Sequence, residues 1–565
     1  MTHAREKSDC AIVAEKLANK AEEPTMENSA VGGPAAEPVE PRAQAEGNAN
    51  QQSTHQAQDW RSVTQALERI RKAARERRTE RFTTLFHHLS IDLLDDAFYE
   101  LKENAAAGVD GLRWQEYEAN IDRNLVDLHD RLHRGAYRAL PSRRVYIPKP
   151  DGRQRPLAVA ALEDKVVQRA AAAVLNAIYE EDFLGFSYGF RPGRGAHNAM
   201  DALVVAITSK RMNFIVDADI RSFFDTVNQQ YLVECVEQRI GDPRMIRLIQ
   251  KWLKAGVLED GIVTVSEIGT GQGAVISPLL ANIYLHYCLD LWAERWRQYE
   301  AKGDMIFVRY ADDFIVGFQH ENEARRFLDA LRERLAEFAL SLHPEKTRLI
   351  EFGRFAAESR KRRGLGKPES FNFLGFTFIC GKSRRGRFLV KRKTRRDRMR
   401  VKLREIKQEL RERMHQPIPK QGRWLRRVVT GYFNYHAVPT NSHAIQAFRF
   451  HVTELWKRAL RRRGQLDRTD WWRITQLAAD WLPSAVIRHP WRGNRSVGSL
   501  EVKAPEGRAY RSDPYRGASN LAGRSKCVNR EAPKDVPRVK RIAGRLGVPS
   551  RSDLGEGHVG IEVLD

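Results

Sequence analysis

The chain has 565 residues, of which 42% are hydrophobic, enough for several domains with buried cores. Its 96 Lys and Arg against 72 Asp and Glu give a net charge of +24, which excludes an acidic protein and favours a polyanionic partner such as nucleic acid. Five scattered cysteines without a CxxC pair argue against a disulfide framework or a zinc module and suit a reducing cytosol. No run approaches 18 apolar residues, so we expect no contact with a membrane.

The first 60 residues differ in composition from the rest. Residues 1–60 hold 5 Lys and Arg against 10 Asp and Glu and are rich in Ala, Gln, Pro and Ser, which predicts a disordered acidic tail. Residues 61–565 therefore carry 91 basic and 62 acidic side chains, a net charge of +29. In residues 61–140 apolar side chains recur three or four positions apart, as in "VTQALERIRKAARERRTERFTTLFHHL", which predicts a helical N-terminal extension.

The texture of the sequence changes at residue 141. In residues 141–380, β-prone stretches such as "RRVYIPK" and "NFIVDADI" alternate with helices, which predicts an α+β domain whose sheet carries helices on one face. Residues 381–495 are predicted to be helical and strongly basic, with 16 Lys and Arg against 4 Asp and Glu in residues 381–413. Residues 496–565 are rich in Gly, Arg, Ser and Pro and are predicted to be loosely ordered.

Two adjacent carboxylates lie between apolar runs in "MIFVRYADDFIVGF". The runs 305–309 and 314–318 predict two strands of a tight hairpin with Asp312 and Asp313 at its tip. Aspartate is an ordinary turn residue, but two neighbouring carboxylates repel each other unless a cation lies between them. The stretch therefore favours a metal site over a plain turn.

Further carboxylates follow the predicted buried strand of "NFIVDADIRSFFDTV". Asp217 and Asp219 are two residues apart and so face the same side of a strand, and Asp225 follows in a turn or helix. Two strands that present three carboxylates could hold two Mg²⁺ ions, since hard oxygen ligands suit Mg²⁺. Such a pair of ions activates a 3′-hydroxyl and stabilises a leaving pyrophosphate.

"YADD" after an apolar strand, preceded by "DADIRSFF", resembles the palm of a reverse transcriptase. The resemblance implies a right-hand polymerase fold of fingers and palm in residues 141–380 and RNA-directed DNA polymerase activity. It also implies that Asp219, Asp312 and Asp313 are the catalytic metal ligands, with Asp217 and Asp225 as secondary alternatives to Asp219. Phe224 would be the steric gate that rejects a ribose 2′-hydroxyl on the incoming nucleotide.

Other motifs follow in the family's order. "VYIPKPDGRQRPLAV" resembles the fingers hairpin, and "GTGQGAVISPLLANIYL" resembles the glycine-rich loop beneath the nascent base pair, although Gly271 stands where the family usually has proline. "GFRPGRGAHNAM" resembles a second fingers motif, "LHPEKT" a nucleotide-site motif and "FNFLGFTF" the primer grip. The implied nucleotide-binding residues are Lys149, Arg155, Phe224, Gln272 and Lys346, and the implied template-binding residues are Arg191, Arg194 and His197.

Over residues 60–495 the chain resembles group II intron-encoded proteins. "RWLRRVVTGYFNYHAVPTN" and "LWKRALRRRGQ" resemble the thumb and maturase domain X of that family, which places both in residues 381–495. The implied partners are group II intron RNA, a DNA target with its primer, and deoxynucleoside triphosphates, in the bacterial cytosol or nucleoid. The oligomeric state stays open, with a dimer among the alternatives. Basic residues and aromatic helices suit RNA binding, and the candidates are Lys391, Arg392, Lys393, Arg395 and Arg396.

One departure from the family and two alternative functions bear on this interpretation. Cys527 is the only cysteine after residue 380, so we expect no zinc-supported HNH endonuclease, and priming would occur at a DNA target or at a replication fork. One alternative is a domesticated reverse transcriptase of the retron, diversity-generating or CRISPR-associated type. The other is an RNA-binding maturase with an inactive polymerase, and the intact aspartates at 219, 312 and 313 argue against it.

Overall fold

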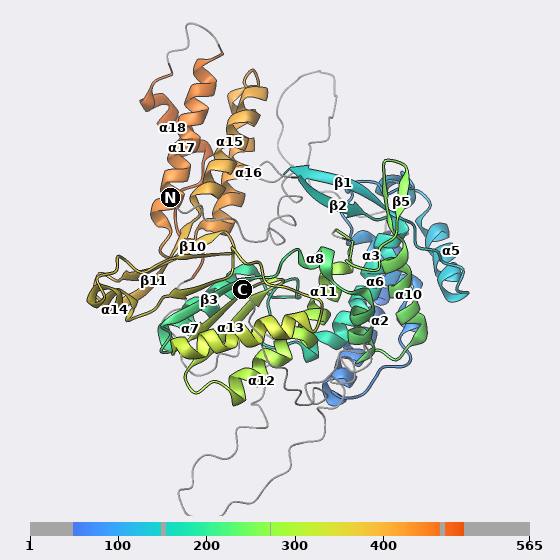
Figure 1. Ribbon diagram of the computed structural model, residues 1–565. Coiled ribbons are helices and arrows are strands. Elements are labelled where there is room, and N and C mark those ends of the chain that lie inside the picture. Colours follow the sequence, from blue (N-terminus) through green and yellow to red (C-terminus); the bar gives the residue numbers. More distant parts are fainter. Residues whose placement is uncertain (1–48, 149–153, 272, 464–468, 491–565) are drawn as a thin grey trace, which may run out of the picture.

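In a computed structural model of the chain, the described residues are 49–148, 154–271, 273–463 and 469–490 (Figure 1). The predicted C-terminal tail, residues 496–565, lies outside the described residues, and so do residues 1–48 of the predicted N-terminal tail. The described part combines helices with three small sheets, as the sequence predicts. Within these residues, no helix is both long enough and apolar enough to cross a membrane.

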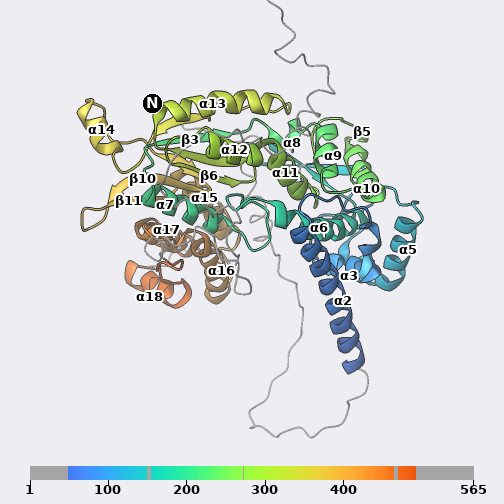
Figure 2. The same cartoon turned by 90° about the horizontal axis from the view of Figure 1, so that it is seen from below.

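The N-terminal part is helical and rests on one long buried helix. Its helices are α2 (Ala49–Glu76), α3 (Ile91–Tyr99), α4 (Trp114–Glu118) and α5 (Ile121–His133), with a 3₁₀ turn at Phe86–His88. α2 and α3 both pack on α6 (Leu162–Asp182), whose Ala- and Val-rich surface is buried along most of its length. Figure 2 shows α2 projecting from the body.

The start of α2 corrects the prediction that all of residues 1–60 are disordered. The helix begins at Ala49, so residues 49–60 are helical. These residues are mostly Gln, Ala, Ser and His, with no Gly or Pro to end a helix, and they extend the amphipathic helix that buries Val63 and Ile70.

A second group of elements lies beside the N-terminal helices (Figure 1). Strands β1 (Ser142–Pro148) and β2 (Gln154–Val159) form a hairpin, and β4 (Val257–Glu259) and β5 (Ile262–Thr264) extend it into a sheet of order β2-β1-β4-β5. In the chain, α6, α7 (Ala196–Ser209) and a strand of the central sheet come next, and α7 packs against that sheet. The helices α8 (Phe223–Thr226), α9 (Gln229–Glu237) and α10 (Pro243–Lys254) then precede β4.

The central sheet has the order β6-β7-β3-β8 and is antiparallel throughout. Its strands are β3 (Phe214–Asp219), β6 (Met305–Tyr310), β7 (Asp313–Phe318) and β8 (Arg348–Glu351). The helices α11 (Ser277–Leu285), α12 (Leu291–Tyr299) and α13 (Glu321–Ala336) follow, with a π-helical turn, η2, at His286–Asp290.

Both faces of this sheet are covered, which corrects the prediction of helices on one face. Val216 belongs to a core shared with α11 and α13, whereas its neighbour Ile215 belongs to a core shared with α7. Figure 2 shows α13 and α7 on opposite sides of the sheet. The physical reason is that β3 and β7 are apolar at consecutive positions, as strands buried on both faces are.

The C-terminal part is a helical bundle mounted on a three-stranded sheet. α14 (Ala356–Arg362) precedes β9 (Phe371–Phe373), β10 (Phe376–Lys382) and β11 (Phe388–Thr394), which are ordered β11-β10-β9. The bundle comprises α15 (Arg396–Glu412), α16 (Ile418–His436), α17 (Ser442–Arg461) and α18 (Trp471–Trp481), with its own buried core (Figure 1).

The predicted change to helix at residue 381 is therefore wrong. β10 runs through residue 381, and β11 continues the sheet to Thr394 before the first helix starts at Arg396. In "GRFLVKRKT" the β-prone Phe388 and Val390 are two residues apart, and buried positions alternate with exposed or half-buried ones from Val390 onward. This two-residue alternation is typical of a strand, although the segment is rich in cations. The high content of Lys and Arg says nothing about helix or strand, whereas the alternation of buried positions predicts the strand.

Candidate active site

The hairpin of β6 and β7 has the predicted geometry. Tyr310 pairs with Asp313, which leaves Ala311 and Asp312 as a two-residue turn, and Ala311 has a positive φ of 56°. Short hairpin turns of this kind need positive φ to match the twist of their strands. Asp312 and Asp313 are each only 4% exposed, so both carboxylates are held at the edge of a buried sheet rather than in a solvated turn.

Asp219 lies directly across from this hairpin. It is the last residue of β3 and pairs with Asp313 in the register of β3 and β7. Directly opposed residues project to the same face of a sheet with their Cβ atoms about 5 Å apart. The pairing of β3 with β7 thus brings Asp219 and Asp313 together, although they are 94 positions apart in the chain (313 − 219).

The two alternative carboxylates are placed less favourably. Asp217 is two residues further from the strand end, pairs with Ile315, and its Oδ2 lies 3.5 Å from the Arg348 guanidinium. Asp225 is exposed on the short helix α8. Of the three aspartates between residues 217 and 225, Asp219 is the one that the sheet sets opposite the hairpin.

The surroundings of Asp219 suit a cation. Its Oδ2 accepts a 2.6 Å hydrogen bond from Lys346 Nζ, whereas its Oδ1 is buried and has no hydrogen-bond partner. A buried carboxylate oxygen without a partner is costly unless a cation compensates it. The described residues contain no group of three or more His, Cys, Asp or Glu arranged to hold a metal ion. This does not conflict with Mg²⁺, because Mg²⁺ usually takes one or two carboxylates and completes its shell with water and substrate phosphates.

A buried ion pair between Arg309 and Asp290 restrains the hairpin turn. The sequence alone gave no reason to single out these two residues. Arg309 precedes the turn by two residues, is fully buried, and donates from Nε to Asp290 Oδ1 at 2.7 Å and from Nη2 to Asp290 Oδ2. Its Nη1 donates to the carbonyl of Ala311 and to Oδ1 of Asn282, both at 3.0 Å. Burial raises the pKa of the Asp290 carboxyl while Arg309 opposes that shift.

The same network reaches the loop before α7. Asn282 Nδ2 donates to the carbonyl of Gly189 at 2.7 Å, and a Cβ at Gly189 would lie 2.3 Å from the Ala311 nitrogen. Position 189 must therefore be glycine for the loop and the hairpin turn to pack this closely. His286 lies in the same interior, where burial and the charge of Arg309 lower its pKa to about 3, so it stays neutral.

The predicted nucleotide-binding residues fall into two groups. Lys149 and Gln272 lie outside the described residues. Lys346 contacts Asp219 as described, and Phe224 is buried on α8, where its carbonyl accepts a hydrogen bond from Thr270 at 2.8 Å. Arg155 is buried on β2, across from Ile147. Of those that the structure describes, Lys346 is the one with a direct contact to one of the three aspartates.

The glycine-rich loop lies close to β2. Gly273 has φ of +113°, and a Cβ there would lie 2.9 Å from the carbonyl oxygen of Ala158. Ser277, the first residue of α11, donates from its hydroxyl to the carbonyl of Gly271 at 3.1 Å. This contact restrains the loop where the family usually has proline.

The predicted template residues are held by the protein itself. Arg191 is buried, pairs with Glu180 at 2.9 Å and donates to the carbonyls of Leu184 and Ser187, so its prediction as a template contact is not supported. The reason is that its guanidinium satisfies buried acceptors at the end of α6. Arg194 donates to the carbonyl of Gly185 at 2.8 Å but is only half-buried.

His197 connects two parts of the molecule. Its Nε2 lies 2.8 Å from the carbonyl oxygen of Tyr435 on α16, and its ring stacks on His489 at 3.9 Å. Burial lowers the pKa of His197. The side chain therefore joins α7 to the helical bundle, a role that competes with the predicted template contact.

Two of the five predicted RNA-binding cations on β11 and α15 are buried. Arg392 is 4% exposed and pairs with Asp201 at 2.7 Å, and Arg395 is buried beside Asp397 at 2.6 Å. Because each satisfies a neighbouring carboxylate, neither is placed to reach RNA phosphates, which corrects the prediction for these two. Lys393 and Arg396 are exposed, and Lys391 is half-buried.

The exposed cations yield a prediction for RNA binding. Replacing Lys393, Arg396 and Arg400, all exposed, with glutamine should weaken RNA binding and reduce the slope of log affinity against log salt by about 2, since each phosphate contact contributes about 0.7–0.9. A filter-binding titration from 50 to 300 mM salt measures the slope. The matched control replaces Arg325, Arg326 and Arg332, which are exposed on α13. Equal slopes for the two triple variants would show that residues 393–400 do not face the RNA.

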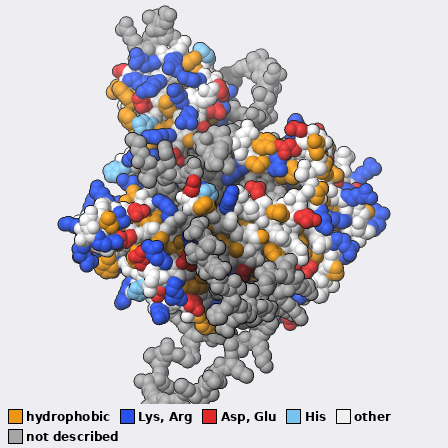
Figure 3. Space-filling model, viewed as in Figure 1, with side chains coloured by type: hydrophobic (Ala, Val, Ile, Leu, Met, Phe, Trp, Pro, Cys, Tyr) orange, Lys and Arg blue, Asp and Glu red, His pale blue; other side chains and the backbone are white. Residues whose placement is uncertain are grey.

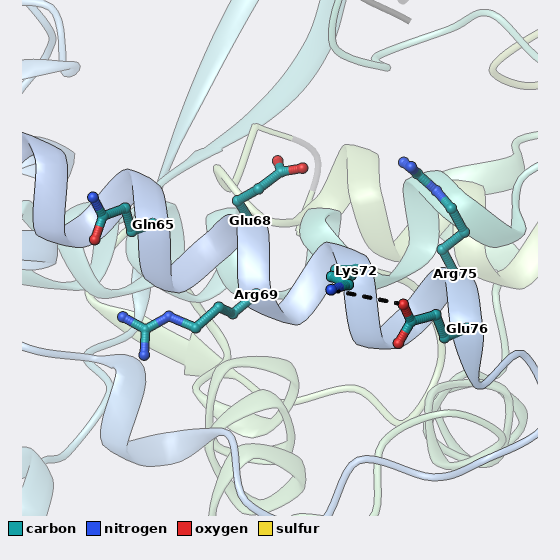
Figure 4. A pocket seen from close by; sticks show the side chains of 6 residues that line it. All are labelled: Gln65, Glu68, Arg69, Lys72, Arg75 and Glu76. Carbon is teal, nitrogen blue, oxygen red and sulfur yellow. Dashed lines mark ion pairs between the residues drawn. The ribbon is translucent and has the colours of Figure 1, made fainter. Parts of the chain in front are cut away.

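A hollow elsewhere on the surface is not part of this site. It runs along one face of α2 and is lined by Gln65, Glu68, Arg69, Lys72, Arg75 and Glu76 (Figure 4). All but Gln65 are charged, and several form ion pairs, as Lys72 with Glu76 and Arg75 with Glu181. None of the six lies on the strands that carry the three aspartates.

Carboxylates at the edge of a buried antiparallel sheet, with cations beside them, define a class of enzyme that transfers nucleotides with divalent metal ions. The comparisons agree with this class. Residues 147–378 match the family described as "Reverse transcriptase (RNA-dependent DNA polymerase)". Protein YkfC of Escherichia coli is 32% identical over 316 residues, which cover 50% of this chain and 78% of that protein.

Two further relatives are associated with introns. The "Group II intron-encoded protein LtrA" of Lactococcus lactis is 36% identical over 222 residues, covering 39% of this chain and 37% of LtrA. The "Putative COX1/OXI3 intron 1 protein" of Saccharomyces cerevisiae is 25% identical over 421 residues, covering 62% of this chain and 49% of that protein. The chain belongs to the reverse transcriptases, which are RNA-directed DNA polymerases, and is related within them to group II intron-encoded proteins.

Proposed function

We propose that this reverse transcriptase copies RNA into DNA with Asp219, Asp312 and Asp313 as its metal-binding carboxylates, and that it binds a group II intron RNA and assists its splicing. The observation that carries the catalytic part is the register of Asp219 opposite Asp313, next to Asp312 in a rigid turn. The carboxylates would hold two Mg²⁺ ions, which supply activation of a primer 3′-hydroxyl and stabilisation of the leaving pyrophosphate.

The chain's own residues position the reactants. Arg309 and Asn282 fix the turn that carries Asp312, so the carboxylates do not have to reorganise when substrate arrives. Lys346 neutralises Asp219 and is within reach of a nucleotide phosphate that replaces this contact. The backbone of Phe224 is tied to Thr270 through its carbonyl, and its ring would be the group that excludes a 2′-hydroxyl. Lys149, Arg155 and Gln272 complete the proposed nucleotide site.

The intron-binding part rests on charge and on the intron-associated relatives. Figure 3 shows Lys and Arg side chains gathered over the helical bundle α15–α18 and over the β10, β11 and α14 end of the molecule. We propose that residues 141–380 are fingers and palm, that residues 381–495 hold the thumb and domain X, and that the latter binds intron RNA. Reverse transcription of the intron would be primed at a DNA target or a replication fork.

The test uses the intron that should surround the reading frame. A transcript of the flanking genomic region is incubated with the full chain at 5 mM Mg²⁺, where the RNA alone should splice slowly. We expect the protein to accelerate ligation of the exons at least tenfold and to bind this transcript more tightly than a transfer RNA of similar charge density. Equal affinity for both RNAs, or no ligated exons, would reject the intron part and favour a domesticated reverse transcriptase.

A further inference from the structure

Three large aromatic side chains are exposed together on the outer face of the helical bundle. Phe450 on α17 is 54% exposed, and Trp471 and Trp472 in the first turn of α18 are 44% and 72% exposed. The rings of Phe450 and Trp471 lie parallel within 10°, with centroids 5.6 Å apart. We call Phe450, Trp471 and Trp472 the aromatic platform.

The platform does not belong to the core of the bundle. That core is filled by other aromatic residues, among them Phe433, Phe448 and Trp456, which are completely buried. Asp470 caps α18 by accepting from the backbone nitrogen of Arg473 at 2.8 Å, which fixes where the helix starts and therefore where the two tryptophans project. Single exposed aromatics are common on protein surfaces, but here two exposed rings stack on each other and a third exposed ring follows directly on α18, which favours a binding surface.

The side chains around the platform are mostly basic, which favours a polyanionic ligand. Lys457 Nζ lies 4.5 Å from the centroid of the Trp471 ring, and Arg458, Arg461, Arg462 and Arg473 are exposed on the same two helices or directly after α17. Two acids lie near the platform: Glu454 on α17 is paired with Arg458, and Asp470 accepts the capping hydrogen bond of α18. Aromatic faces beside cations match one ligand chemistry, in which flat bases alternate with phosphates.

We propose that the aromatic platform binds unpaired bases of RNA by stacking, while the surrounding cations contact the phosphates. The proposal rests on the proposed function, in which the bundle binds RNA, and it adds which residues contact the unpaired bases. A duplex does not fit, because its base faces are already stacked on one another and only its backbone and base edges are accessible. Neither a second copy of this chain nor residues 491–565 would explain the cations beside the rings.

The experiment compares a 16-nucleotide single-stranded RNA of mixed sequence with a blunt 16-base-pair RNA duplex. The double variant Trp471→Ala/Trp472→Ala should bind the single strand about 10- to 100-fold more weakly, because each stacked base contributes about a tenfold factor or more. Affinity for the duplex should stay within twofold, and the salt slope for the single strand should be unchanged because no phosphate contact is removed. The double variant Trp471→Phe/Trp472→Phe, which retains a ring at both positions, should bind the single strand nearly as tightly as the wild type.

Two controls separate stacking from other effects. Tyr299→Ala removes a residue that is 77% exposed on α12 and should leave both affinities unchanged. Quenching of tryptophan fluorescence by the single strand should be clear for the wild-type chain and largely lost in the double variant. Unfolding temperatures should match the wild type, since the replaced rings are exposed.

Each other outcome overturns the proposal in a recognisable way. If the wild type binds RNA and the double variant binds the single strand equally well, the platform is rejected while the proposed function stands. If affinities for single strand and duplex fall together, the rings support the fold. If the variant changes sedimentation from dimer to monomer with unaltered RNA affinity, the platform is an interface between copies. If the wild type binds no RNA, the proposed function fails as well.

Discussion

Replacing Asp313 with alanine is expected to abolish cDNA synthesis, with a loss of at least about 10³-fold in rate, while RNA affinity stays near the wild-type value. The carboxylate lies opposite Asp219 at the strand end, where a shared cation would offset the repulsion between the two opposed acids. Losing a metal ligand removes several kcal/mol of transition-state stabilisation, and about 1.4 kcal/mol corresponds to tenfold in rate. Primer extension on an RNA template under single-turnover conditions measures the loss.

The stability of the same variant gives an independent readout. Removing one of two opposed carboxylates relieves repulsion, so the unfolding temperature of Asp313→Ala without Mg²⁺ should equal or exceed that of the wild type. Added Mg²⁺ should raise the unfolding temperature of the wild type but not of the variant, because only the wild type binds the ion at this edge. Asp225→Ala, which removes an exposed carboxylate on α8, is the matched control and should retain both activity and the response to Mg²⁺. Full cDNA synthesis by Asp313→Ala would contradict the site.

The hairpin of β6 and β7 was predictable because local sequence determines it. Apolar runs on either side of "YADD" leave one way to form two buried strands, and a two-residue turn then fixes where both aspartates lie. The partner aspartate was predictable to within one alternate position, since Asp217 and Asp219 share a strand face. The strand period alone does not separate these two. The resemblance to reverse transcriptases favours Asp219, and the register of β3 with β7, which depends on the packing of the whole sheet, sets Asp219 opposite Asp313.

Burial of charged residues could not be predicted from composition. Arg191, Arg392 and Arg395 occur in motifs dense with cations, yet each satisfies a carboxylate within the fold. Their partners, such as Asp201 for Arg392, lie in other elements, and a single sequence carries no signal for such a contact. An arginine can bind a phosphate or a buried carboxylate with the same geometry, so only the tertiary structure separates the two.

The aromatic residues show the same limit. "GYFNYHAV" suggested rings for stacking on RNA, but Tyr432 and Phe433 are buried in the bundle, and Tyr432 stacks on Phe448 at 3.5 Å. The exposed rings are Phe450, Trp471 and Trp472, which lie outside that phrase. The helical period does separate the two groups in retrospect, because Phe450 falls between the buried Phe448 and Val452 and so faces away from the core.

A second large effect is expected at the buried pair of Arg309 and Asp290. Arg309→Met alone should destabilise the protein by about 3–5 kcal/mol, because it leaves the Asp290 carboxylate buried without its partner. Its unfolding temperature should fall by several degrees, and cDNA synthesis should be lost together with stability. This single variant therefore cannot separate support of the fold from positioning of the hairpin.

The double variant Arg309→Met/Asp290→Leu separates the two roles. Replacing a buried ion pair with apolar side chains of similar volume is commonly neutral or stabilising, so the unfolding temperature should return to about the wild-type value. In the double variant the Ala311 carbonyl and Asn282 Oδ1 have still lost the guanidinium of Arg309 as their hydrogen-bond donor. The turn that carries Asp312 is therefore less restrained. A displacement of about 1 Å at reacting groups costs about 10²-fold in rate. We therefore expect kcat for cDNA synthesis to remain about 10- to 100-fold below the wild type with little change in nucleotide KM. Wild-type kcat in the stable double variant would show that the pair serves stability alone, whereas a low kcat identifies Arg309 as the residue that positions the catalytic turn.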